Sequence, residues 1–214
     1  MAVLFDMDGV IAHTNPFHHE AIRRFCEKYG FHLSEEEMKQ RIYGRTNKDW
    51  ITALFGSMHA EDLQRLAEEK EALFRDLYRA QVQPVRGLLQ FMQELARHRI
   101  ICALTTSAPP ANVDFLMAHI PVKPYFSITL DERAVTHGKP HPEIYLKAAK
   151  ALQLPNRRCV VIEDSLSGIA AARAAGSPVV GITTTHTAHE LAHADYIIRD
   201  FYDLSVDDLQ RLVA

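Results

Sequence analysis

Two aspartates separated by one residue follow the first apolar run of the sequence. Asp6-Met7-Asp8-Gly9 comes directly after Ala2–Phe5, and residues i and i+2 of an extended chain point to the same side. Two converging carboxylates repel each other unless a cation or a shared proton lies between them, and Mg²⁺ prefers such oxygen ligands. Gly9 allows a sharp turn and the close approach of a ligand. The alternative is a strand end that carries two solvated acids.

Three more clusters of reactive residues each follow a short apolar run. Thr105-Thr106-Ser107 offers hydroxyl and backbone N–H groups to an anion, or else caps a helix. Lys139, between Gly138 and Pro140, is a point charge on a stiff loop, suited to a phosphate, or else a solvated lysine. Glu163-Asp164-Ser165 places two acids after a buried run, where they bind a metal or Asp164 caps a helix.

The elements that must position these clusters alternate between strand and helix. The apolar runs are four or five residues long and lack polar alternation, which is typical of parallel strands buried on both faces. They are Ala2–Phe5, Ile100–Leu104, Phe126–Leu130, Cys159–Ile162 and Pro178–Ile182. Helices are predicted at 87–98, 111–119, 142–152 and 165–175, the last ending at Gly176. The pattern predicts an α/β fold with a Rossmann-like, doubly wound parallel sheet, whose ligands bind at the carboxyl ends of the strands.

Residues 15–82 break this alternation. Apolar residues recur there at helical spacing, Ser34-Glu35-Glu36-Glu37 has the form of a capping box, and no strand pattern intervenes. We therefore predict an all-helical subdomain at 15–82, inserted into a core made of residues 1–14 and 83–214.

Composition and charge exclude several classes of protein. The chain has 214 residues, 47% of them hydrophobic and 24% charged, which is typical of a globular protein with a buried core. A net charge of −3 argues against nucleic acid as a partner, and no apolar run is long enough to span a membrane. The three scattered cysteines, Cys26, Cys102 and Cys159, are expected to be reduced core residues of a cytoplasmic protein.

Together the four clusters supply a nucleophile, a second acid, an anion cradle, a cation and metal ligands. That set suits phosphoryl transfer through a covalent aspartyl phosphate. The ordered motifs resemble the haloacid dehalogenase superfamily, and most closely its β-phosphoglucomutase-like branch, which consists mainly of small-molecule phosphatases. The motifs are Asp6-Met7-Asp8-Gly9-Val10, Thr106, Gly138-Lys139-Pro140-His141-Pro142 and Glu163-Asp164-Ser165-x-x-Gly168.

The resemblance implies a role for each core residue. Asp6 attacks the phosphorus, and Asp8 protonates the leaving oxygen and then activates water. Thr106 and Ser107 hold phosphoryl oxygens, and Lys139 neutralises charge. Mg²⁺ is the implied cofactor, with Asp6, the backbone carbonyl of Asp8 and Asp164 as ligands and Glu163 in support.

The resemblance also makes the helical insertion a mobile cap that selects the substrate. Thr14 and His18 occupy its hinge-side positions, and Gly44-Arg45-Thr46-Asn47 corresponds to a specificity loop whose plain alternative is a helix cap at Thr46. Lys70 stands where the mutase branch has a cap lysine. Asn47 stands where the mutase itself has an arginine, and an amide lacks the charged fork that holds a second phosphate.

The sequence thus favours a Mg²⁺-dependent phosphatase acting on a small phosphorylated metabolite, and the resemblance favours a sugar phosphate. A β-phosphoglucomutase-type enzyme is the first alternative, and a non-catalytic binding protein on the same scaffold is the second. The sequence marks no subunit interface, so the oligomeric state stays open and a monomer is consistent with it.

Overall fold

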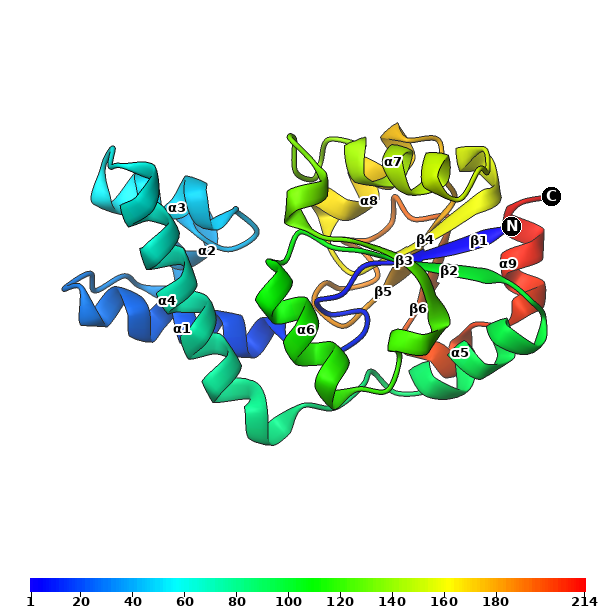
Figure 1. Ribbon diagram of the computed structural model, residues 1–214, viewed down its shortest axis with the longest axis horizontal. Coiled ribbons are helices and arrows are strands. Elements are labelled where there is room, and N and C mark those ends of the chain that lie inside the picture. Colours follow the sequence, from blue (N-terminus) through cyan, green and yellow to red (C-terminus); the bar gives the residue numbers. More distant parts are fainter. The chain divides into compact units, whose positions relative to one another are not determined.

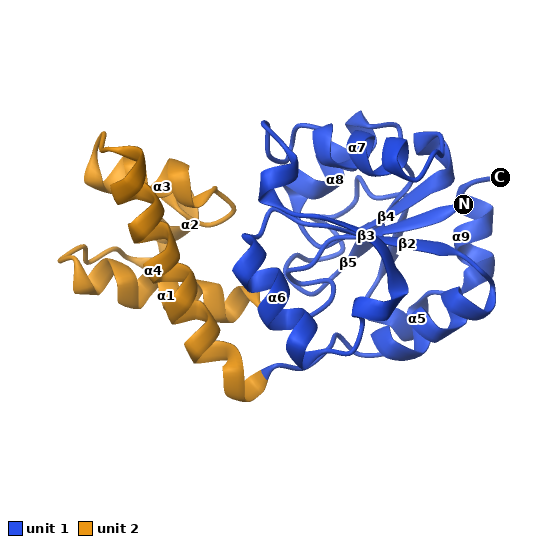
Figure 2. Cartoon of the chain, in the orientation of Figure 1, with its two compact units in different colours: residues 1–13, 82–214 blue, residues 14–81 orange.

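The computed structural model describes all 214 residues, which divide into two compact units. Unit 1 consists of residues 1–13 and 82–214, and unit 2 of residues 14–81 (Figure 2). Each boundary lies one residue from the boundary expected from the sequence.

Unit 1 is built on a six-stranded sheet in which every neighbouring pair is parallel, in the order β3-β2-β1-β4-β5-β6 (Figure 1). Strand β1 therefore lies near the centre, between β2 and β4, and its four residues are all buried. The strands are β1 (Ala2–Phe5), β2 (Ile101–Thr105), β3 (Phe126–Leu130), β4 (Cys159–Glu163), β5 (Val179–Ile182) and β6 (Tyr196–Ile198).

Helices cover both faces of this sheet (Figure 1). They are α5 (Leu88–Arg97), α6 (Pro110–His119), α7 (Glu143–Ala151), α8 (Leu166–Ala174) and α9 (Val206–Leu212). Ala2 and Leu4 pack with residues of α7 and α8 in one apolar cluster. Phe5, the next residue, points to the other face, where its ring centre lies 6.2 Å from that of Phe201 in a tilted arrangement. The doubly wound prediction is confirmed.

Three details differ from the sequence prediction. Strand β3 alternates between half-buried and exposed residues, because it is an edge strand and is not buried on both faces. Strand β6 and helix α9 were not predicted. β6 has only three residues, and α9 has only seven, so neither is long enough to give a clear periodic pattern.

Unit 2 is helical throughout, with α1 (Asn15–Lys28), α2 (Glu35–Arg41), α3 (Asn47–Phe55) and α4 (Ala60–Tyr78). The predicted capping box forms at the start of α2, where Ser34 and Glu37 bond each other's backbone N–H groups. Thr46 caps α3 by accepting the N–H of Asp49. An apolar cluster that includes Phe25, Met38 and Trp50 forms the interior of the unit.

All three cysteines are free and buried, as expected. No helix combines the length and the apolarity that crossing a bilayer requires.

A buried charged network ties three helices of unit 2 together. Lys70 and Glu71, both only 4% exposed, are bonded to each other at 2.7 Å. Lys70 Nζ also lies 3.1 Å from Nδ1 of His18 on α1. The Asn47 amide of α3 donates to the same Glu71 oxygen at 2.7 Å, and its own oxygen accepts the indole N–H of Trp50 at 3.1 Å. Glu71 is therefore the acceptor at the centre of the network.

Burial by itself raises the pKa of the Glu71 carboxyl, but the charges on Lys70 and His18 and the bonds from Asn47 and Lys70 outweigh burial. They lower the pKa from 4.5 to about 2. A carboxyl whose pKa is lower in the folded chain stabilises the fold above its ordinary pKa. That contribution is lost as the pH falls through the folded-state pKa.

We therefore predict that unit 2 loses on the order of 3 kcal/mol of stability between about pH 5 and pH 2, through Glu71. The chain has one tryptophan, Trp50, so its fluorescence in denaturant titrations reports on unit 2. The Glu71→Gln variant should be destabilised at pH 7 and should lack most of this pH dependence. The Glu69→Gln variant is the control, because Glu69 lies on the same helix as Glu71 but makes a partly exposed pair with Lys28 of α1. An unchanged acid profile in Glu71→Gln would contradict the assignment.

Candidate active site

The carboxyl ends of three adjacent strands bring the predicted core residues to one edge of the sheet. Asp6 follows β1, Thr106 follows β2, and Glu163 and Asp164 lie at the end of β4. Parallel neighbours place their carboxyl ends side by side. The Asp6 N–H continues the ladder by donating to the carbonyl of Ile162 at 3.0 Å, so Asp6 is held in register with the end of β4.

Lys139 joins two of these carboxylates. Its ammonium lies 2.6 Å from Oδ1 of Asp6 and 2.5 Å from Oε1 of Glu163. The lysine side chain is 7% exposed, and its Nζ is also 3.5 Å from the carbonyl oxygen of Thr105. The residue predicted as a loop lysine is therefore a buried cation that contacts the proposed nucleophile directly, and its alternative as a solvated lysine is wrong.

The electrostatic balance of the site is strongly negative. Burial raises the pKa of Asp6 well above its ordinary value, and Glu163, Asp164 and Asp8 raise it further, while Lys139 lowers it. Burial, followed by the charge on Glu163, raises the pKa of Asp164 to about 7. One ammonium therefore faces four carboxylates, and the site lacks positive charge.

The donor set fits a hard divalent cation. Asp6, Glu163 and Asp164 each have a carboxylate oxygen in a group whose members all lie within 4.8 Å of one another, and all three are buried. An all-oxygen set of this kind suits Mg²⁺. A dication would neutralise the carboxylate repulsion that adds to burial in raising the pKa values of Asp6 and Asp164.

Both oxygens of Glu163 are engaged by the protein itself. Oε1 accepts from Lys139 and from the Tyr145 hydroxyl at 2.7 Å. Oε2 accepts the backbone N–H groups of Asp164 and Ser165 at 3.1 and 3.2 Å, and the Ser165 hydroxyl at 2.9 Å. Five donors thus hold one fully buried carboxylate.

Packing against Glu163 explains why position 168, in the fourth motif, is a glycine. A Cβ at Gly168 would lie 1.9 Å from Oε1 of Glu163. The Gly168 N–H donates to Oγ of Ser165 at 3.0 Å, which makes Ser165 the cap of α8. The alternative that Asp164 caps this helix is therefore wrong, because Ser165 takes that place. The Asp164 carboxylate instead accepts a bond from the hydroxyl of Thr185.

The predicted anion cradle has mixed exposure. Thr106 is 1% exposed, and its Oγ1 accepts the backbone N–H of Ala108 at 3.0 Å, whereas Ser107 is exposed. Asp8 lies in the turn after β1, where it pairs with Ala12 in an isolated bridge. That Asp8, Thr106 and Ser107 act on a substrate stays a prediction.

The predicted cap residues all belong to unit 2. His18, Asn47 and Lys70 lie in the network around Glu71 described above. Thr14 is fully buried at the start of α1, and the exposed Arg45 donates to the carbonyl of Gln40 at 3.1 Å. Contact of these five residues with a substrate stays a prediction.

Two histidines flank Lys139, and together with Glu143 they brace its loop. Glu143 accepts the backbone N–H groups of Thr136 and His137 at 3.1 and 2.9 Å, and His137 Nδ1 lies 3.1 Å from the same carboxylate. His141 Nδ1 accepts the N–H of Glu143 at 3.3 Å. These mutual bonds engage the carboxylate and one nitrogen of each ring.

Sequence reasoning missed three residues next to the site. Thr185 contacts Asp164, and Thr184 donates its hydroxyl to the carbonyl of Gly9 at 2.6 Å. Both follow β5 directly, so the rule that located the other clusters would have found them. Tyr145 could not be found by this rule, because an aromatic residue among the apolar positions of a helix is expected to be an ordinary core residue.

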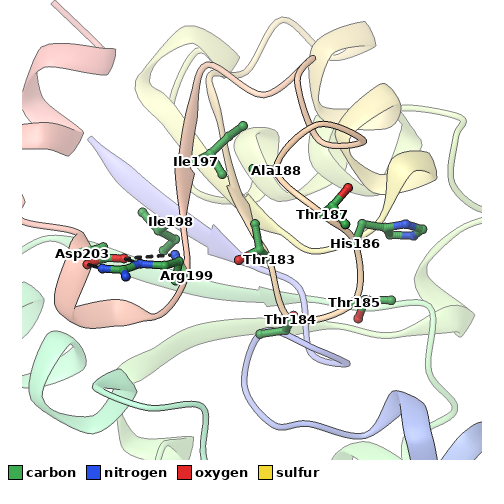
Figure 3. A pocket seen from close by; sticks show the side chains of 10 residues that line it. All are labelled: Thr183, Thr184, Thr185, His186, Thr187, Ala188, Ile197, Ile198, Arg199 and Asp203. Carbon is green, nitrogen blue, oxygen red and sulfur yellow. Dashed lines mark hydrogen bonds and ion pairs between the residues drawn. The ribbon is translucent and has the colours of Figure 1, made fainter.

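A hollow of about 720 Å³ opens beyond the ends of β5 and β6 (Figure 3). Thr183–Ala188 line one side of it. Arg199 and Asp203, which are bonded to each other at 2.9 Å, lie on the other side. It adjoins the carboxylate cluster through Thr185, but Asp6 and Lys139 are not among its lining residues.

Comparison with known proteins gives one consistent result. Residues 3–182 match the family model described as haloacid dehalogenase-like hydrolase. The chain is 35% identical to a phosphorylated carbohydrates phosphatase of Thermotoga maritima, over 82% of this chain and 81% of that protein. It is 26% identical to the β-phosphoglucomutase of Bacillus subtilis, over 96% and 92% of the two chains. A HAD hydrolase of family IA, variant 3, from Entamoeba histolytica has a similar crystal structure, with 31% identity and a TM-score of 0.91 over 99% and 98% of the two chains.

We predict that Gly168→Ala destabilises unit 1 by about 2 to 4 kcal/mol, because Glu163 must leave its five donors to make room. Without that clash, alanine in a helix would stabilise the chain by about 1 kcal/mol. The free energy of unfolding from denaturant titrations, followed by circular dichroism, measures the change. Leu166→Ala, at an exposed position of the same helix, is the control and should change stability by less than about 1 kcal/mol. A stabilised Gly168→Ala variant would contradict the packing described here.

Proposed function

The chain belongs to the haloacid dehalogenase-like hydrolase family, and from that premise we propose that it is a Mg²⁺-dependent phosphatase of small phosphorylated carbohydrates. We propose a covalent aspartyl phosphate on Asp6 as the intermediate. The observation that carries the proposal is the position of Asp6, buried beside Lys139 and Asp164 at the carboxyl edge of the sheet.

The first half-reaction begins at Asp6. Its carboxylate attacks the phosphorus, a new oxygen–phosphorus bond forms, and the bond from phosphorus to the sugar oxygen breaks. Asp8 donates a proton to that leaving oxygen. Lys139 contacts Asp6 at 2.6 Å and so supplies positive charge where the phosphoryl group gathers negative charge.

The second half-reaction releases phosphate. Asp8, now ionised, takes a proton from water, and the water oxygen attacks the phosphorus of the aspartyl phosphate. The bond between phosphorus and the Asp6 carboxylate breaks, which regenerates the nucleophile. Thr106 and the backbone at Ser107 hold phosphoryl oxygens through both steps.

Mg²⁺ supplies charge neutralisation and orientation of the phosphoryl oxygens when it is bound. We propose that Asp6, Asp164 and the backbone carbonyl of Asp8 hold it. Because both oxygens of Glu163 already accept bonds from the protein, we assign to Glu163 the positioning of Lys139, and not direct ligation. Thr185 orients Asp164 through its hydroxyl bond.

The substrate class rests on the relatives and on unit 2. A relative named for phosphorylated carbohydrates covers most of the chain. We propose that unit 2 selects the substrate, with Lys70 and His18 as its polar contacts and Thr14, Arg45 and Asn47 in support. The three free, buried cysteines support a reducing compartment, and hence the cytoplasm.

A phosphosugar mutase is the second candidate, because the Bacillus subtilis mutase is similar along nearly the whole chain. A mutase must hold a bisphosphate intermediate. Here Asn47 is an amide, and its nitrogen is bonded to the acidic Glu71, which also pairs with Lys70. This arrangement favours a monophosphate substrate and hence hydrolysis. Glucose 6-phosphate formation from β-glucose 1-phosphate, primed with a bisphosphate, separates the two activities.

We predict that the wild-type chain hydrolyses p-nitrophenyl phosphate and at least one sugar phosphate with Mg²⁺ and loses that activity with EDTA. Release of inorganic phosphate from a panel of phosphorylated metabolites measures it. No turnover across the panel would favour the non-catalytic alternative.

We predict that Asp6→Asn lowers kcat at least about 10³-fold and abolishes the phosphoenzyme detected by intact-protein mass spectrometry, because an amide is a poor nucleophile. Asp131→Asn is the matched control. Asp131 also follows a strand of the sheet and is 9% exposed, but it is bonded to Arg133. Near-full turnover by Asp6→Asn would exclude the mechanism.

A further inference from the structure

Tyr145 carries a hydroxyl into an otherwise apolar part of the core. It lies on α7, is fully buried, and its neighbours in the cluster include Leu4, Ala148 and Val161. The same space would accept phenylalanine. A buried hydroxyl costs free energy unless it is bonded, so its bond to Glu163 at 2.7 Å is the reason that it is tolerated there.

The oxygen that Tyr145 contacts is also the oxygen that binds Lys139. Oε1 of Glu163 accepts the Tyr145 hydroxyl at 2.7 Å and the Lys139 ammonium at 2.5 Å. Lys139 Nζ also lies 5.3 Å from the centre of the Tyr145 ring, within cation–π range. Tyr145 thus acts on Lys139 through a shared acceptor and through its ring.

This geometry decides how strongly the Lys139 ammonium interacts with each of two carboxylates. Its ammonium is 2.6 Å from Asp6 and 2.5 Å from Glu163, so the two acids compete for it. A hydroxyl that donates to Oε1 satisfies part of the charge on Glu163 and weakens its attraction for the ammonium. Without that donor, Glu163 draws Lys139 away from Asp6.

We propose that Tyr145 is a positioning residue of the active site, whose hydroxyl holds Glu163 so that Lys139 stays on Asp6. The kinetic part of this proposal rests on the proposed phosphatase function, while the geometric part does not. The Tyr145 hydroxyl is bonded to Glu163 and its ring faces Lys139, so it acts on Asp6 through these two residues.

The test is Tyr145→Phe, which keeps the ring and removes the hydroxyl. With p-nitrophenyl phosphate and saturating Mg²⁺, kcat should fall about tenfold while KM changes less than about twofold. The control is Ser177→Ala, which removes another buried hydroxyl, bonded to the carbonyl of Asn156 at 3.1 Å and outside the site. It should lose stability and keep its kcat. Equal kcat in Tyr145→Phe and wild type, or an equal fall in both variants, would overturn the proposal.

A double variant tests whether Tyr145 acts through Glu163. Adding Tyr145→Phe to the Glu163→Gln variant should lower kcat by less than about twofold. The reason is that Glu163→Gln already alters the interaction that the Tyr145 hydroxyl supports. If the two effects multiply in full, the route through Glu163 is wrong.

A structural measurement separates this proposal from the proposed function. In a crystal structure of Tyr145→Phe, Lys139 Nζ should lie farther from Asp6 by about 0.5 Å or more, whether or not the protein turns over a phosphate ester. An unmoved Lys139 would overturn the proposal even in an active phosphatase. A shifted Lys139 in a chain without phosphatase activity would support it while the proposed function fails.

Discussion

The contact on which the site depends is the bridge that Lys139 makes between Asp6 and Glu163. It places the single buried ammonium of unit 1 among four acidic side chains, so its position decides which of them is compensated. Several hydrogen bonds around the site hold the three residues of this bridge in place. The ladder bond from the Asp6 N–H to Ile162 holds the backbone of Asp6, five donors hold the Glu163 carboxylate, and Glu143 accepts bonds from the loop that carries Lys139. Each partner of the bridge is thus held by bonds of its own.

The negative charge that Lys139 leaves uncompensated costs the fold free energy. Asp6 and Asp164 are both buried, and their pKa values are raised first by that burial and then by the charge on Glu163, while Lys139 partly offsets the effect. Burying acids this close together costs free energy, which the proposed cation would offset. The hydroxyls of Thr184 and Thr185 stabilise the two loops that bear these acids, since one bonds the Gly9 carbonyl and the other bonds Asp164. One short segment after β5 therefore supports both acidic loops.

The order of the strands and the family resemblance together predicted most of the residues that meet at the sheet edge. Parallel strands place their carboxyl ends at one edge, which brings Asp6 and Asp164 together, and the resemblance added Lys139 beside Asp6. The different bonding of Glu163 and Asp164 was not predictable, because a sequence shows which residues can accept hydrogen bonds but not which donors reach them. Glu163 accepts five bonds from the protein, whereas Asp164 accepts a bond from Thr185. Tyr145 was hidden because its ring matches the apolar pattern of α7. The short elements β6 and α9 were missed because three and seven residues give too few repeats of a pattern.

The two segments that leave and re-enter unit 1 around residues 14–81 are joined to each other. Ala12 forms an antiparallel bridge with Pro84, and the N–H of Val85 donates to the carbonyl of Ile11 at 2.9 Å. The ends of the insertion are thus closed within unit 1 like the stem of a hairpin. The parallel pairing of β1 with β2 does not involve any inserted residue. Evolution can therefore exchange, lengthen or trim the inserted helices as a module without disturbing the strand pairing at the centre of the sheet.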